Sequence, residues 1–112
     1  DELAQRLGIR FNGVLANRYR DGQDSMGWHS DDERELGEQP LIASLSFGAV
    51  RRFRLRHKNS GAKPIAIELE SGSLLVMAGA TQQNYRHDLP KTARAVGERI
   101  NLTFRRIVTP AR

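Results

Sequence analysis

The side chains of His29, Asp31 and His87 have the types and the spacing of a metal site. His29 and Asp31 lie two positions apart, so in an extended backbone both side chains project to the same side and can meet at one ion. Two imidazoles and one carboxylate are the ligands of the facial triad that holds non-haem Fe(II) and leaves other coordination positions open. A zinc hydrolase can use the same ligand types, and the chain has no cysteine to supply a thiolate. The three residues therefore predict a metal centre, and they do not decide whether the metal is iron or zinc. The simpler alternative is that His29 is an ordinary loop histidine and His87 an ordinary histidine at the end of a strand.

The segment RINLTFR, residues 99–105, carries polar side chains at every second position. In a strand, one face would hold Arg99, Asn101, Thr103 and Arg105. If that face points inward, its two arginines need anionic partners, because an unpaired buried charge is costly. A dicarboxylate that chelates the metal could be one such partner, through paired hydrogen bonds to a guanidinium. If the face points to solvent, the arginines are merely exposed, and the pattern leaves both arrangements open.

Short segments with strand-like alternation or apolar runs recur about every ten residues, with turn residues between them. These segments are residues 11–20, 41–47, 51–58, 64–70, 73–77 and 99–108. Such a series predicts an all-β sandwich or barrel and argues against alternating strands and helices. Residues 1–9 are predicted to form a short amphipathic helix, with Leu3 and Leu7 on one face, and the polar segment 79–90 is expected to be irregular. The length of 112 residues suits a single domain over residues 1–112.

The chain is basic overall, and its charge is unevenly distributed. Eighteen Lys and Arg residues stand against thirteen Asp and Glu residues, which gives a net charge of +5. In the segment RRFRLRHK, residues 51–58, the side chains of Arg52, Arg54 and Arg56 share one face, whereas acids gather in residues 31–35. This distribution suggests a polyanionic partner and a cationic ligand near the acids, against the alternative of a basic protein with no nucleic-acid role. No apolar run approaches the ~20 residues of a membrane-spanning helix, so we expect no membrane partner.

Several motifs, in their order along the chain, resemble those of the AlkB-type Fe(II)/2-oxoglutarate dioxygenases. They are NRYRDG, WHSDDERE, IASLSFGA, RFRLRHK, GSLLVM, YRHDLP and RINLTFR, which begin at residues 17, 28, 42, 52, 72, 85 and 99. The subgroup that they resemble most is the DNA repair demethylases. The resemblance implies a mainly β double-stranded β-helix, or jelly-roll, in which His29, Asp31 and His87 hold Fe(II). It also implies a 2-oxoglutarate site, with the residues Asn17, Tyr19, Arg99, Asn101 and Arg105.

The activity that this resemblance implies is oxidative dealkylation of N-methylated bases, such as 1-methyladenine and 3-methylcytosine, in DNA or RNA. Dioxygen and 2-oxoglutarate are consumed, and succinate, carbon dioxide and formaldehyde are released. Because these bases are cationic, a carboxylate beside the flipped base would favour them. Glu33 matches the family's pocket acid, Asp32 is the second candidate, and Tyr19 could line the same pocket, although an acidic loop is usually solvated. Contacts to the nucleic-acid backbone would come from Arg52, Arg54, Arg56, His57 and Lys58, unless the arginines only solubilise an outer face.

Two features depart from the family pattern. Relatives generally carry an upstream nucleotide-recognition segment, which residues 1–112 are expected to lack, and Arg86 precedes His87 where relatives often have an aromatic residue. The alternatives are an oxygenase that acts on a protein or a small molecule, and a nucleic-acid-binding β domain without catalysis. We expect a monomer, located in the cytoplasm of a bacterium or the nucleus of a eukaryote.

Overall fold

The computed structural model describes residues 11–32, 36–37 and 39–107, so the helix predicted for residues 1–9 lies outside the described residues. The strands are β1 (Gly13–Tyr19), β2 (Met26–His29), β3 (Ile42–Gly48), β4 (Arg51–His57), β5 (Ile65–Leu69), β6 (Leu74–Met77), β7 (Tyr85–Leu89) and β8 (Arg99–Arg105). A short helix, α2 (Thr81–Asn84), lies between β6 and β7. Across this part of the chain, no helix has the length and apolar character needed to cross a membrane.

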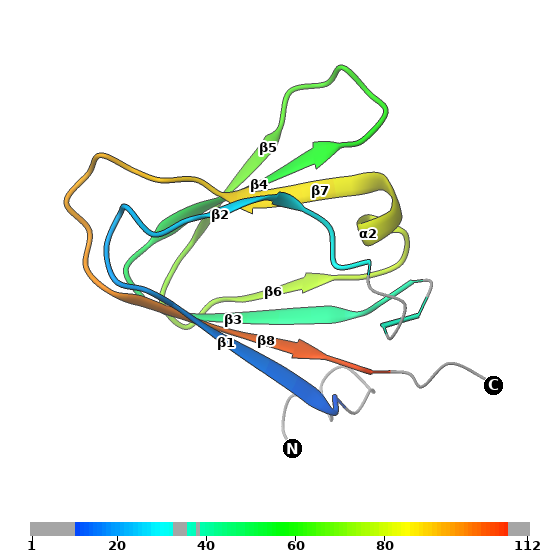
Figure 1. Cartoon of the computed structure of the whole chain (residues 1–112), viewed down its shortest axis with the longest axis horizontal. Coiled ribbons are helices and arrows are strands. Elements are labelled where there is room, and N and C mark those ends of the chain that lie inside the picture. The colour runs from blue at the N-terminus through cyan, green and yellow to red at the C-terminus, as the bar shows by residue number, and fades with distance from the viewer. Residues whose placement is uncertain (1–10, 33–35, 38, 108–112) are drawn as a thin grey trace.

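The strands form two antiparallel sheets of four strands each, which lie as two layers in Figure 1. The first sheet has the order β1-β8-β3-β6, and the second has the order β2-β7-β4-β5. Strands that are far apart in the sequence are therefore neighbours, as β1 and β8 are, and segments from the two ends of the chain meet in one sheet. Two packed antiparallel sheets with these crossovers confirm the predicted mainly β jelly-roll.

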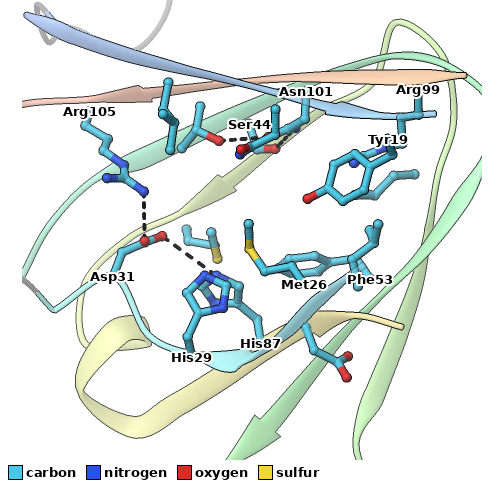
Figure 2. A pocket seen from close by; sticks show the side chains of 17 residues that line it. Tyr19, Met26, His29, Asp31, Ser44, Phe53, His87, Arg99, Asn101 and Arg105 are labelled. Atoms are coloured by element: carbon cyan, nitrogen blue, oxygen red, sulfur yellow. Dashed lines mark hydrogen bonds and ion pairs between the residues drawn. The ribbon is translucent and has the colours of Figure 1, made fainter. Parts of the chain in front are cut away.

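Two strands lie where the sequence shows no strand-like alternation. β2 lies at the edge of the acidic region, and β7 occupies residues 85–89, so the expectation that 79–90 is irregular was wrong for this part. The two strands pair with each other, and β7 also pairs with β4. Several of their polar side chains point into the space between the sheets, which is why apolar periodicity did not reveal them (Figure 2).

The polar face of β8 points into the molecule. Arg99 and Asn101 are buried, whereas Ile100 between them is 39 % exposed. Strand register places apolar residues of β1, β3 and β6 beside Ile100 on the outer face of this sheet, among them Val14, Phe47, Leu74 and Val76. Along β8 the usual arrangement is therefore reversed, with polar residues inward and apolar residues outward.

The apolar core lies between the sheets and is small. Its buried members are Tyr19, Leu36, Ile42, Phe53, Leu69, Met77 and Leu89. Ile42, at the start of β3, is completely buried. Most of these side chains also line the cavity that holds the candidate site, so the same packing that stabilises the fold forms the apolar wall of the cavity.

A buried arginine joins the loops at one end of the two sheets. Arg51 is 2 % exposed, and its guanidinium donates hydrogen bonds to the carbonyl oxygens of Asp21, Asp24 and Pro90 at 2.8 to 3.0 Å. These carbonyls belong to the β1–β2 and β7–β8 connections. Because three carbonyl groups satisfy its donors, Arg51 can face inward beside Phe53 without a carboxylate partner.

We expect Ile42→Ala to lower the free energy of unfolding by about 2–5 kcal/mol, because it removes a fully buried side chain and leaves a cavity. The matched control is Ile65→Ala in β5, where the side chain is 55 % exposed. That change should cost no more than about 0.5 kcal/mol. Urea unfolding followed by tryptophan fluorescence measures both, and equal losses would contradict the described packing.

Candidate metal centre and anion pocket

The three candidate ligands come from two neighbouring strands of the second sheet. His29 ends β2, Asp31 lies two residues beyond it, and His87 lies in the middle of β7. His29 and His87 are directly opposite each other in the β2–β7 pairing, and their ring centroids are 4.2 Å apart. One ligand atom from each of the three residues can be chosen so that all lie within 4.8 Å of one another. The structure thus brings together all three residues that the sequence predicts as ligands.

Hydrogen bonds orient two of these side chains, those of His29 and Asp31. Nδ1 of His29 lies 2.8 Å from the carbonyl oxygen of Gly27, so Nδ1 must carry the proton and Nε2 keeps its lone pair for a metal. The Asp31 carboxylate accepts a hydrogen bond from Nη2 of Arg105 at 2.9 Å through Oδ1, and its Oδ2 lies 3.7 Å from Nε2 of His87. Figure 2 shows the contacts of Asp31 with Arg105 and His87. The three side chains therefore offer ligand atoms that lie close enough together to share one ion.

The protonation state of His87 also suits a metal ligand. Burial, with a smaller contribution from the neighbouring His29, lowers the pKa of His87 to about 4. Metal binding requires the neutral form of imidazole, which His87 has at neutral pH. Two imidazoles and a carboxylate fit Fe(II), and the absence of thiolate ligands favours it over a soft-metal site.

The buried end of the same cavity carries a positive charge without an acidic partner. Arg99 is 2 % exposed, and Nη2 donates a hydrogen bond to the hydroxyl of Ser46 at 2.9 Å. Within the described residues, no carboxylate forms an ion pair with Arg99, and its Nε has no hydrogen-bond partner. Burial lowers the pKa of Arg99, yet a guanidinium stays charged in a protein. A buried cation in this state fits the distal carboxylate of 2-oxoglutarate.

Tyr19 lies against this cation. The guanidinium carbon atoms of Arg99 and Arg51 are 5.1 and 5.7 Å from the centre of the Tyr19 ring. Burial raises the pKa of the phenol, although the charges of Arg99 and Arg51 oppose the shift, so the hydroxyl keeps its proton at neutral pH. In Figure 2 the hydroxyl points into the cavity. Tyr19 can therefore donate a hydrogen bond to an anion that Arg99 binds.

The remaining polar residues of the pocket bond mainly to one another. Nδ2 of Asn101 donates to the hydroxyl of Ser44 at 2.5 Å, and Oδ1 accepts from Thr103 at 2.8 Å. Asn17 is half-buried and lies opposite Asn101 in the β1–β8 pairing. Asn101 thus reaches the cavity with both ends of its amide in use, whereas Asn17 lines the cavity with no such internal bonds.

The basic face of β4 differs from the simple row of free cations that the sequence suggests. Arg52 pairs with Glu68 at 2.9 Å, and Arg54 forms a two-bond pair with the buried carboxylate of Asp88 at 2.5 and 2.8 Å. The guanidinium carbon atoms of Arg54 and Arg56 lie 4.9 and 4.3 Å from the centre of the Trp28 ring. Among the described residues, Arg56 has no acidic partner. Of Arg52, Arg54 and Arg56, it is therefore the arginine that forms no ion pair within the described part of the chain.

The other predicted contacts are placed as follows. Nδ1 of His57 accepts a hydrogen bond from the backbone of Asn59 at 3.1 Å, and Nζ of Lys58 donates to the carbonyl oxygen of Gln82 at 3.0 Å. Asp32 is exposed, and Glu33 lies outside the described residues. The acidic candidates for lesion recognition thus stay predictions, and Lys58 has a structural bond that the sequence did not indicate.

Several residues of the site carried no clear signal in the sequence. Gln82 lies in a polar stretch that looked like a loop, yet it is 1 % exposed and bonds to the backbone of Asp31. Ser44 and Ser46 lie on the inner face of β3 and support the polar face of β8. Their alternation within the apolar segment 42–47 could have been matched to that of residues 99–105, because polar residues on neighbouring strands tend to share a face.

Comparisons with known proteins agree with this geometry. Residues 1–105 match the model of the 2OG-Fe(II) oxygenase superfamily. The chain is 46 % identical over 115 aligned residues to the mouse DNA oxidative demethylase ALKBH2, which covers 96 % of this chain and 48 % of that protein. It is 44 % identical over 115 residues to the human alpha-ketoglutarate-dependent dioxygenase alkB homolog 3, with 96 % and 40 % covered. The chain thus spans less than half the length of these relatives.

A solved structure shows the same fold. The structure of OsALKBH1 superposes with a TM-score of 0.71 at 23 % identity, over 88 % of this chain and 49 % of that one. The family match covers nearly the whole sequence and contains both the His-Asp-His cluster and the buried arginine. The chain therefore belongs to the 2OG-Fe(II) oxygenase superfamily, whose members need Fe(II) and 2-oxoglutarate.

Proposed function

We propose that residues 1–112 form one oxygenase domain that removes N-linked methyl groups from bases such as 1-methyladenine and 3-methylcytosine in DNA or RNA. The observation that carries this proposal is the buried Arg99, which lacks an acidic partner among the described residues and shares a cavity with the His-Asp-His cluster. The names of the ALKBH2 relatives, which describe DNA oxidative demethylases, support DNA as the substrate. We also propose that the protein acts as a monomer, in the cytoplasm if it is bacterial and in the nucleus if it is eukaryotic.

The metal ligands and the cosubstrate residues divide the cavity between them. His29, Asp31 and His87 would hold Fe(II) at one end, while Arg99 and the Tyr19 hydroxyl would bind the distal carboxylate of 2-oxoglutarate at the other. Together with dioxygen, the bound groups supply the oxidation of a methyl group, with release of succinate and carbon dioxide. The hydroxymethyl group that forms on the base nitrogen leaves as formaldehyde, and the base regains its ordinary structure.

Other side chains of the pocket orient these groups. Arg105 donates to the Asp31 carboxylate and fixes which oxygen faces the metal position. Asn101 is held by Ser44 and Thr103, so it shapes the floor of the pocket, and Asn17 has an amide available for the cosubstrate. Apolar side chains line the rest of the cavity, among them Met26 and Phe53, and they exclude water from the reaction.

Recognition of the lesion falls to the acidic segment that follows Asp31. A methylated adenine or cytosine of this type is a cation, so a carboxylate near the metal would favour it over the neutral base. Glu33 is the first candidate and Asp32 the second, and Tyr19 contributes to the pocket wall. Contacts to phosphates come from the basic face of β4, where Arg56 is the strongest candidate because Arg52 and Arg54 already have acidic partners.

Anaerobic addition of Fe(II) and 2-oxoglutarate should produce a weak visible absorption band, because the cosubstrate would chelate the bound metal. We expect His29→Ala, Asp31→Ala and His87→Ala each to remove the band and the succinate formed in air, since each removes one ligand. His57→Ala is the matched control, because His57 lies on β4 away from the cluster, and this variant should keep the band. Full succinate formation by any ligand variant would show that the metal site is assigned wrongly.

Arg99→Lys should raise the apparent KM for 2-oxoglutarate roughly tenfold to hundredfold, because an ammonium cannot reproduce the paired hydrogen bonds of a guanidinium. Arg52→Lys, at an exposed position that is paired with Glu68, provides the comparison and should leave this KM unchanged. Steady-state succinate formation at varied 2-oxoglutarate measures both. An unchanged KM for Arg99→Lys would remove the main support for the cosubstrate site.

Arg56→Ala should lower the slope of log K against log salt for duplex DNA by about 0.9, the contribution of one lost phosphate contact. Arg52→Ala should change the slope less, because its guanidinium is already neutralised by Glu68. Fluorescence anisotropy with a methylated oligonucleotide at several salt concentrations measures the slopes. Equal slopes for wild type and Arg56→Ala would rule out this phosphate contact.

A separate measurement distinguishes the substrate classes. Succinate formation that is stimulated by a methylated oligonucleotide would favour DNA over a protein or a small molecule as the substrate.

A further inference from the structure

The helix α2 places one polar side chain in the interior, close to the metal ligands. Gln82 is 1 % exposed and is among the largest fully buried side chains of the described residues. The helix contains four residues and lies directly before β7, which carries His87. Burial of a carboxamide is costly unless its oxygen and nitrogen find partners, so the contacts of Gln82 need an explanation.

The oxygen of this side chain has one strong partner. Oε1 of Gln82 accepts a hydrogen bond from the backbone N–H of Asp31 at 2.7 Å, although the two residues are far apart in sequence. β2 ends at His29, so no strand partner in the sheet pairs with the buried N–H of Asp31. Gln82 supplies the acceptor that the sheet does not.

The nitrogen of the same amide has only a weak partner. Nε2 of Gln82 lies 3.5 Å from the sulfur of Met77, and a thioether is a poor acceptor. The two neighbours also determine which way the amide points, because only its oxygen can accept from the N–H of Asp31. The hydrogen bond from Asp31 to Oε1 therefore explains why a carboxamide is buried at this position, since Nε2 makes only a weak contact.

The segment that carries Asp31 is fixed to the α2–β7 unit at three successive residues. His29 is opposite His87 in the strand pairing, the hydroxyl of Ser30 donates to the carbonyl oxygen of Tyr85 at 2.7 Å, and Asp31 donates to Gln82. The bond of Gln82 is the last of the three and acts on the backbone of a metal ligand. It continues the attachment between the two segments beyond the end of β2.

We propose that Gln82 is a positioning residue of the metal centre, which holds the backbone of Asp31 at the distance from His87 that three-ligand binding requires. The inference rests on the proposed function and deepens it. It states that Gln82, which is not a ligand, places the carboxylate of Asp31. The Asp31 side chain is oriented by Arg105, and its backbone is held by Gln82. Residues that orient metal ligands typically affect metal affinity about tenfold to hundredfold when they are removed.

The test measures binding of Ni(II) alone by isothermal titration calorimetry, together with the unfolding temperature of the metal-free protein. Gln82→Met keeps the length of the side chain and removes the acceptor. We expect it to weaken Ni(II) binding by about tenfold to hundredfold. Gln82→Glu keeps an oxygen that can accept from Asp31, and it should recover most of the lost affinity.

Thr81→Ala is the matched control in the same helix. Thr81 donates its hydroxyl hydrogen to the carbonyl oxygen of Ala78 and does not contact Asp31, so its loss should lower the unfolding temperature and leave Ni(II) affinity unchanged. If Gln82→Met lowers the unfolding temperature but binds Ni(II) as tightly as wild type, Gln82 has only a structural role and the inference is wrong. Equal weakening by Gln82→Met and Gln82→Glu contradicts it as well. Failure of the wild type to bind Ni(II) would instead overturn the proposed function.

Discussion

The pairing of β2 with β7 places His29 directly opposite His87, and the metal centre depends on this one cross-strand contact. Side chains opposite each other in an antiparallel pair have Cβ atoms about 5 Å apart, which suits two imidazoles that share an ion. Asp31 completes the cluster only because the chain continues beside the same strand after β2 has ended. Two segments that are far apart in the sequence thus form a compact site through strand pairing and the hydrogen bonds of Ser30 and Asp31.

The cavity requires a sheet whose polar side points inward. The inner face of β8 carries arginine, asparagine and threonine, and hydroxyl groups of β3 accept hydrogen bonds from it, which keeps the cost of burial low. Arg99 is the exception, because the described residues supply it with a hydroxyl but no negative charge. Arg99 thus needs a negatively charged partner, and 2-oxoglutarate, the cosubstrate that the family needs, has a carboxylate that can serve as one.

Much of the fold and the candidate metal ligands follow from residue types and spacing, whereas the roles of the 2-oxoglutarate residues were implied by the family resemblance. Alternation in residues 99–105 predicts a strand with a polar face, and the His-Asp spacing predicts two ligands on one side. The sequence could not show that the polar face of this strand points inward. Polar and apolar residues alternate with the same period whichever face is buried. The same limit applies to β7, whose polar residues point into the cavity and therefore lack the usual apolar pattern.

Contacts between segments that are distant in sequence were beyond prediction. The ion pairs of Arg52 and Arg54 depend on the register of β4 with β5 and β7, which no local pattern of the chain determines. The role of Gln82 depends on where the chain runs after β2 ends. Single-residue signals thus identified the ligands, whereas the side chains that support them became visible only with the three-dimensional arrangement.

The strict alternation of polar and apolar residues in β8 determines how the protein responds to insertion or deletion of a residue. Insertion or deletion of one codon within residues 99–105 would let the backbone keep its ladder with β1 and β3, but it would turn every subsequent side chain to the opposite face. Isoleucine and leucine would then enter the polar cavity, and the guanidinium groups would leave it. In the β4–β5 connection, residues 58–64, a change of length leaves the facing of every strand intact. Length changes that preserve the reading frame are therefore tolerated in that loop and excluded from β8.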